Sequence, residues 1–385
     1  MVDLDNENLI EPVLDPDRQR QAKEYARTGR YLSFAEIVVV AVFLALLAFG
    51  GFSERLTWYS NLPVIPAAIL YFLILVAAYR LLTSPISYYG GYVLPRRYGL
   101  SKQSLSGWLG DLVKAGALTL VLGIAIVAIV YWLIIVQPQL WWLFCWGFLV
   151  LFSLVMSVLA PVLLVPIFFK MKPLEDGELR DRLEKLAKRV GVEIGGIYTI
   201  EFSSKSTTAN AALMGMDRTK RIVLSDTLLN KYSASEIEVI MAHEMAHSHH
   251  RDMLRLFVFQ SVILLVNLYA AGIILNAVIE PLGFSGLSDI SALPLLALIF
   301  AAINLLLSPI TTGYGRRIET EADGYALELT NDPFSFISAM ARLTEQNLAE
   351  ADPNHWVEML LHDHPSYRSR LAHARRFAES KQDSK

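Results

Sequence analysis

The sequence is poor in cysteine, in charge and, over its first 242 residues, in histidine. A single cysteine, Cys145, among 385 residues excludes an intramolecular disulfide framework and a cysteine-rich zinc site. Charged residues make up only 18% of the chain, and the formal net charge of −3 gives no basic signal for nucleic acid, so we expect no nucleic-acid partner. The first apolar run begins too late for a cleavable signal peptide, and none is predicted.

Apolar residues, by contrast, are abundant, at 54% of the chain. A helix needs about 18–20 apolar residues to cross a bilayer. Six uncharged stretches approach or exceed that length: Ile37–Phe52, Leu62–Tyr79, Ala115–Val136, Leu140–Phe169, Leu256–Ile279 and Ile290–Tyr314. The fourth contains Pro161 and Pro166 and is expected to kink or to leave the membrane near Pro166. The pattern predicts a mainly α-helical, polytopic membrane bundle with about six spans.

Basic residues gather in alternate loops between these runs. The basic positions are Arg18, Arg20, Lys23, Arg27 and Arg30, then Arg96, Arg97 and Lys102, then Lys170 and Lys172, and finally Arg316 and Arg317. The positive-inside rule therefore predicts that both termini and the polar region from Lys170 to Arg255 lie in the cytoplasm.

One short motif is typical of metal chemistry. His243-Glu244-Met245-Ala246-His247 matches H-E-x-x-H. Residues four apart share a helix face, so the two imidazoles can bind one zinc ion while Glu244 acts as general base on a zinc-activated water. Ser233 and Glu236 form a capping-box pattern that starts this helix two turns earlier. The alternative interpretation is a solvated helix with scattered histidines.

A catalytic zinc ion needs a third protein ligand and one open position. His250 is on the same face but lies about 10 Å from His243 along the helix axis, at ~1.5 Å per residue, which is too far. The third ligand should therefore come from another helix. In RRIETEADGYALEL, Glu319 and Asp323 are four apart, as a carboxylate ligand and a carboxylate that orients a histidine would be. The alternative is a solvated acidic face.

A third polar segment, LHDHPSYRSRL, contains His362, His364, Arg368 and Arg370. A histidine or arginine at this place can stabilise the oxyanion of a peptide-bond transition state. The alternative is an exposed turn with ordinary charges.

The motifs HEMAH, RRIETEAD and HDHP, in this order, resemble the integral-membrane zinc peptidases that include the type I CAAX prenyl proteases. Further segments share the resemblance, which extends from about Arg20 to Phe377: SPISYYGGYVLPRRYGLSKQSLSGWLGD, APVLLVPIFFKMKPLEDGEL and SKSTTANAALMGMDRTKRIVLSDTLL. There are two departures. The eukaryotic members are described with seven spans, and ALMGM replaces a segment that is often aromatic in the family.

The resemblance implies one Zn²⁺ per chain, held by His243, His247 and Glu319. It implies that Glu244 is the general base and that Asp323 supports a zinc-bound histidine.

The resemblance also gives roles to residues outside the zinc ligands. His364 would help to stabilise the transition state, and Arg370 would be the arginine that follows the His-Pro motif. Asn210, Ala211 and Ala212 would belong to an edge strand that pairs with an extended substrate, and such pairing aligns a peptide by its backbone.

The expected protein is a membrane-embedded zinc metalloendopeptidase of the gluzincin type, with a zincin-like α+β protease domain. Its substrates would be peptides or proteins, including prenylated or membrane-associated ones, and it would lie in a bacterial inner membrane or, in a eukaryote, in the endoplasmic reticulum. The expected regions are 1–33 (N-terminal segment), 34–170 (four spans), 171–255 (zinc helix), 256–315 (two spans) and 316–385 (C-terminal helices).

Two alternatives remain at this point. The first is a heat-shock type quality-control protease for misfolded membrane proteins, with the same chemistry. The second is a non-catalytic membrane scaffold or transporter with a structural zinc ion. A structural site has no use for a general base at Glu244, which disfavours the second alternative.

Overall fold

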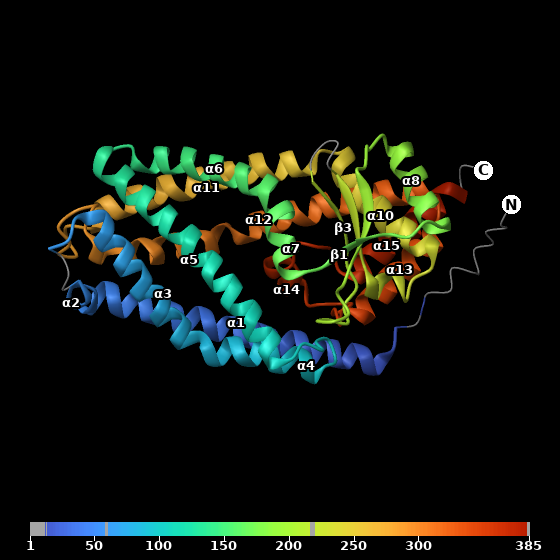
Figure 1. Ribbon diagram of the computed structural model, residues 1–385, viewed down its shortest axis with the longest axis horizontal. Coiled ribbons are helices and arrows are strands. Elements are labelled where there is room, and N and C mark those ends of the chain that lie inside the picture. The colour runs from blue at the N-terminus through green and yellow to red at the C-terminus, as the bar shows by residue number, and fades with distance from the viewer. Residues whose placement is uncertain (1–11, 13, 58–60, 216–219, 383–385) are drawn as a thin grey trace.

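Long apolar helices form one half of the molecule (Figure 1), seen in a computed structural model that describes residues 12, 14–57, 61–215 and 220–382. Among these residues six helical stretches are long and apolar enough to cross a membrane. They are α1 (Pro16–Phe49), α3 with its continuation (Val64–Arg97), α5 (Leu105–Val136), α6 (Trp141–Leu159), α11 (Asp252–Val278) and α12 with its first turn (Ile290–Thr330). The prediction of a polytopic, mainly helical fold with six spans is confirmed.

Two of the long helices change their winding at or just before a proline. α3 (Val64–Tyr88) passes through a π-helical turn, η1 (Tyr89–Val93), into α4 (Leu94–Arg97). Likewise α6 passes through η2 (Ala160–Leu164) into α7 (Val165–Phe168). Proline lacks the N–H that an α-helix needs, and a π turn accommodates the missing bond. The kink that Pro161 and Pro166 predict is therefore present, as a change of winding followed by the end of the helix.

Within the membrane bundle, α11 packs against both α6 and α12. Trp141 and Cys145 of α6 are 1% exposed and belong to one apolar cluster with residues of the other two helices. Cys145 is thus a buried residue that packs as a small hydrophobe. Gly272 of α11 faces the indole of Trp142 on α6, which would lie 3.5 Å from a Cβ at that position, an ordinary contact distance.

A small four-stranded sheet begins the other half of the molecule. Its order is β1-β2-β4-β3, with β2 and β4 parallel and the outer pairs antiparallel. The strands are β1 (Met171–Pro173), β2 (Gly196–Ile200), β3 (Ala211–Met214) and β4 (Arg221–Ser225). β3 is an edge strand, and the amphipathic helix α8 (Glu178–Val190) buries Leu183 and Leu186 in the core beside the sheet.

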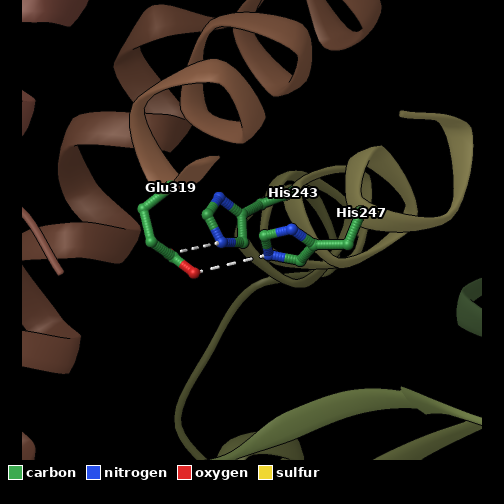
Figure 2. Close-up of side chains that lie close together, drawn as sticks. All are labelled: His243, His247 and Glu319. Carbon is green, nitrogen blue, oxygen red and sulfur yellow. Dashed lines mark ion pairs between the residues drawn. The ribbon is translucent and has the colours of Figure 1, made fainter. Parts of the chain in front are cut away.

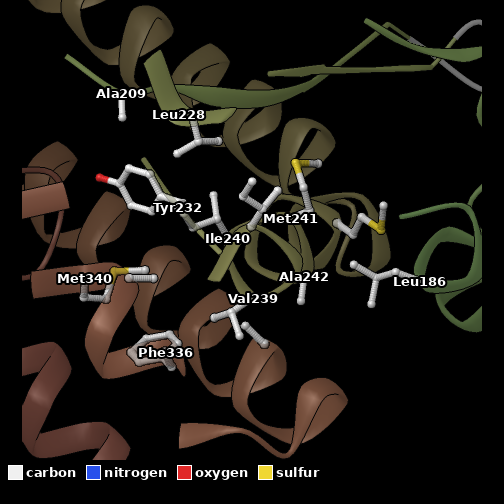
Figure 3. Close-up of a cluster of buried hydrophobic side chains, with 14 of the residues drawn as sticks. Leu186, Ala209, Leu228, Tyr232, Val239, Ile240, Met241, Ala242, Phe336 and Met340 are labelled. Atoms are coloured by element: carbon white, nitrogen blue, oxygen red, sulfur yellow. The ribbon is translucent and has the colours of Figure 1, made fainter. Parts of the chain in front are cut away.

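Helix α10 (Ala234–His249) lies at the centre of this core. The capping box forms as predicted: the Ser233 side chain accepts from the Glu236 N–H, and the Glu236 carboxylate accepts from the Ser233 N–H. Figure 3 shows the apolar face of α10 packed among side chains of neighbouring helices, including Phe336, which is fully buried on α13 (Pro333–Gln346). The helix that carries H-E-x-x-H is therefore rigidly held on its apolar side.

Two membrane-crossing helices continue without a break into the half of the molecule that contains the sheet. α11 starts three residues after α10 ends, and α12 (Leu293–Thr330) runs for 38 residues from the bundle to a position beside α10. The region boundaries expected at 255/256 and 315/316 fall inside these two helices. The remaining helices are short: α2 (Phe52–Leu56), α9 (Asp226–Leu229), α14 (His355–Leu361) and α15 (Tyr367–Gln382).

Candidate metal centre and active site

Three predicted ligands meet between α10 and α12 (Figure 2). One ligand atom from each of His243, His247 and Glu319 lies within 4.8 Å of the others. Nε2 of His243 is 3.3 Å from one carboxylate oxygen of Glu319, and Nε2 of His247 is 3.6 Å from the other. The i, i+4 spacing places both imidazoles on one face of α10, and the long α12 delivers the carboxylate to them.

The outer nitrogen of each imidazole faces a buried carboxylate. Nδ1 of His243 lies 2.9 Å from Asp323, and Nδ1 of His247 is hydrogen-bonded to Asp252 at 3.0 Å. Both carboxylates are 1% exposed. A histidine held in this way has its Nε2 lone pair available to a cation. Asp323 was predicted from its spacing, whereas Asp252, five residues after His247, was missed by the sequence analysis.

The electrostatics of the site suit a cation. Burial by itself lowers the pKa of His243, but the carboxylates of Asp323 and Glu319 outweigh it and raise the pKa to about 10. The negative charges that favour a proton on His243 would also favour a metal cation bound in its place. Two imidazole nitrogens and one carboxylate are the donor set of a catalytic zinc site.

Glu244 lies half-buried next to the two histidines. Burial raises the pKa of its carboxyl group, while His243 and His247 act in the opposite direction. A carboxylate with a raised pKa accepts a proton more readily near neutral pH, as a general base must.

The loop from His362 to Pro365, named the His-Pro loop, lies beside the third ligand. Nε2 of His364 is 3.4 Å from Glu319, and its side chain is 59% exposed. From α15, Arg370 reaches both Glu319, at 3.3 Å, and Asp323, at 3.1 Å, and is 12% exposed. Both predicted residues therefore meet the metal-ligand cluster.

One guanidinium ties this loop to α12. Nη1 of Arg316 donates to the backbone carbonyls of Glu358, Met359 and His362, at 2.8, 3.1 and 2.5 Å. These carbonyls belong to the C-terminal end of α14 and to the residue that follows it, where most carbonyls have no partner inside the helix. Arg316 was not singled out in the sequence, because its partners are backbone atoms more than forty residues away.

The other polar candidates lie apart from the ligand cluster. Arg368 forms an ion pair with Asp352 at the surface. His249 and His250 both pack on the ring of Tyr325 from α12, with His249 stacked at 4.5 Å between ring centroids. His250 is thus a helix–helix contact, consistent with its exclusion as a ligand.

The predicted substrate strand is one of the two edge strands of the sheet. Ala211 and Ala212 are in β3 and pair with β4, and Asn210 immediately precedes the strand, bonded to Ser225 by both its N–H and its C=O. Within the described residues, no strand pairs with the opposite edge of β3.

A cavity of about 980 Å³ opens next to β3 and the metal-ligand cluster. Glu244 and His247 form part of its wall, and α6 and α11 supply most of the remainder. Its lining from these two helices is largely apolar: Leu149, Val150, Leu154, Met253, Leu254, Leu256, Phe257 and Leu264.

The fold is a multi-pass helix bundle, and its site combines an H-E-x-x-H helix with one carboxylate as the third candidate ligand. Together they define a membrane metallopeptidase. A family profile described as "Peptidase family M48" matches residues 173–378, and one described as "CAAX prenyl protease N-terminal, five membrane helices" matches residues 7–170. The chain belongs to peptidase family M48 and is a multi-pass membrane metalloendopeptidase of the CAAX prenyl protease type. Within residues 7–170, four of the described helices meet the criteria for a span, one fewer than the profile's description.

Relatives and a solved structure agree with this assignment. A "CAAX prenyl protease 1 homolog" of Oryza sativa is 30% identical over 78% of this chain and 71% of its own length. An "Uncharacterized metalloprotease YhfN" of Bacillus subtilis is 28% identical over 94% of this chain and 86% of its own length. The crystal structure of S. mikatae Ste24p has the same fold, with a TM-score of 0.83 at 23% identity, over 95% of this chain and 90% of that one.

Proposed function

We propose that the chain is a zinc-dependent endopeptidase that cleaves an extended segment lying along the edge of β3. His243, His247 and Glu319 would hold the zinc ion, which would polarise the scissile carbonyl and acidify water at the site. The observation that carries the proposal is the convergence of these three donors, with Glu244 beside them, at the wall of a large cavity.

Glu244 moves the protons in this proposal. Its carboxylate takes a proton from the attacking water and later passes it to the leaving amine. The raised pKa of Glu244, caused by burial, favours the first of these transfers.

His364 and Arg370, which both lie beside Glu319, support the reaction in different ways. His364 donates a hydrogen bond to the oxyanion as charge develops on it, because its exposed imidazole lies beside Glu319. Arg370 contacts Glu319 and Asp323 together and so holds both carboxylates in place.

Substrates with an attached prenyl chain near the cleaved bond suit the cavity. It begins at Glu244 and His247 and continues between apolar side chains of α6 and α11, so an apolar chain can lie there while the peptide lies on β3. The relatives' names, CAAX prenyl protease 1, support the same substrate class.

We further propose that the metal centre faces the cytoplasm. The N-terminal part of α1, which contains Arg18 to Arg30, and the segment after α7, which contains Lys170 and Lys172, lie on the side of the bundle that carries the sheet and α10. The positive-inside rule assigns that side to the cytoplasm.

The decisive experiment compares purified wild-type protein with Glu244→Gln and with Glu238→Gln, a control on the same helix. Glu238 pairs with Arg182 at 3.6 Å and lies away from the ligands. Zinc content and cleavage are measured with a farnesylated CAAX peptide and with an unfolded membrane protein. All three proteins should hold about one zinc ion, and only Glu244→Gln should fail to cleave.

The preferred substrate separates the two kinds of protease. Preference for the farnesylated peptide supports the prenyl-substrate proposal, whereas preference for the unfolded protein supports a quality-control role. Zinc binding without cleavage of either substrate by the wild type would refute the proposed peptidase activity on these classes.

A further inference from the structure

Asp252, the first residue of the membrane-spanning helix α11, is a buried carboxylate in contact with the metal-ligand cluster. Its Oδ2 is hydrogen-bonded to Nδ1 of His247 at 3.0 Å, and its Oδ1 accepts from Arg255 at 2.7 Å. The same Arg255 nitrogen reaches Glu321 of α12, also at 2.7 Å. A continuous series of contacts thus joins His247 on α10 to both α11 and α12.

The backbone before Asp252 is shaped to make this contact. Arg251 has φ 56° and ψ 40°, in the left-handed region that non-glycine residues seldom adopt. The turn at Arg251 separates α10 from α11 and brings the N-terminal residue of α11 back to His247.

We propose that Asp252 is a positioning residue for the metal ligand His247, and that Arg255 and Glu321 fix Asp252 in turn. A carboxylate that accepts the Nδ1–H selects the tautomer whose Nε2 lone pair is directed at Glu319, and it makes that nitrogen a better donor to a cation. This inference rests on the proposed metal site. It adds that a membrane span contributes directly to metal affinity.

The two ligand histidines are supported from different membrane helices. Asp323, 2.9 Å from His243, lies on α12, whereas Asp252 lies on α11. Because each imidazole depends on a different helix, the orientation of the pair depends on how α11 and α12 sit against α10.

A purely structural role for Asp252 makes a different prediction. An acidic residue in the first turn stabilises a helix N-terminus by its charge, and this contribution does not depend on a bound metal ion. Asp252→Asn keeps the size and removes the charge, so it separates the two roles. Asp289→Asn is the matched control, because Asp289 caps the start of the helical segment before α12 and its partners are Ser285 and Ser291.

The test measures zinc dissociation constants by competition with a chromophoric chelator, together with the visible spectrum of the cobalt(II)-loaded protein. Asp252→Asn should weaken zinc binding about 10- to 100-fold and shift the cobalt bands, and Asp289→Asn should change neither. The thermal midpoint of metal-free Asp252→Asn should stay close to that of the wild type.

Arg255→Met supplies a second variant if Asp252→Asn does not fold. It should weaken zinc binding several-fold, and the double variant should bind zinc no more weakly than Asp252→Asn. Zinc affinity within twofold of the wild type for Asp252→Asn, with an unchanged cobalt spectrum, would overturn the inference and leave the peptidase proposal intact. Absence of zinc from an otherwise active wild type would refute both the zinc site and this inference.

Discussion

Replacing Arg316 by methionine should lower activity without removing the metal. The three hydrogen bonds from its Nη1 hold the end of α14 and the His-Pro loop against α12. A hydrogen bond to a charged group contributes about 1.5–3 kcal/mol, and three that share one nitrogen should together contribute about 2–3 kcal/mol. If that free energy keeps His364 beside Glu319, its loss corresponds to a fall in kcat/KM of about 30- to 150-fold.

The assay is a double-mutant cycle on the preferred peptide. kcat/KM is measured for the wild type, Arg316→Met, His364→Ala and the double variant, with zinc content determined for each. Because Arg316 acts through His364, the double variant should be no slower than His364→Ala. Zinc content should be constant, since the guanidinium is directed at carbonyls of α14 and the loop.

Arg317→Met is the control for this cycle. Arg317 is the adjacent arginine, 72% exposed and paired at the surface with Glu321, and such pairs contribute at most about 1 kcal/mol. Its kcat/KM should stay within a few-fold of the wild type. An equal fall caused by Arg316→Met in the presence and absence of His364 would show that Arg316 does not act through that residue.

Three further predictions follow from particular contacts. Gly315→Ala should lower kcat/KM several-fold, because a Cβ there would lie 3.2 Å from a backbone oxygen of the His-Pro loop, whereas Gly313→Ala should match the wild type in the same assay. Asp226 should stabilise the fold until acid protonates it. Partial burial raises its pKa, but hydrogen bonds from Ser203 and from the backbone of Phe202 lower it below 3.8. Its contribution is therefore complete above the unfolded-state pKa and is lost as the pH falls through the lower folded-state value, so Asp226→Asn should flatten the fall in thermal midpoint below about pH 4. Finally, a chelator should abolish cleavage, added zinc should restore it, and circular dichroism should show the helices retained throughout.

The sequence was sufficient to predict the elements whose signals are local. The six apolar runs correspond to six helices, and the capping box and the i, i+4 histidines fix α10 and the direction of its ligands. Glu319 and Asp323 could be proposed from their spacing, and the family resemblance selected them from other acidic residues.

The contacts that depend on tertiary turns could not be predicted. Asp252 is five residues from His247, and only the left-handed turn at Arg251 brings it back to the imidazole. Arg316 donates to backbone carbonyls. Every residue has such a carbonyl, so residue types do not reveal these partners. The ends of α11 and α12 also extend past the apolar runs, because helix hydrogen bonding continues wherever packing supports it, inside or outside lipid.

Residues of α10 and of two membrane spans, α11 and α12, together form the metal centre. This predicts which parts of the protein zinc should stabilise. Saturating zinc, at about 100 times its dissociation constant, adds about 2.7 kcal/mol to the native state. Since Glu319 lies on α12 and Asp252 begins α11, hydrogen exchange should slow on zinc addition in the first turns of α11 and around Glu319 as well as in α10. Exchange in α3, which packs against α1 and α5, should not change. Slowing confined to α10 would mean that the spans do not share in metal binding, and the coupling argued from Asp252 would then be wrong.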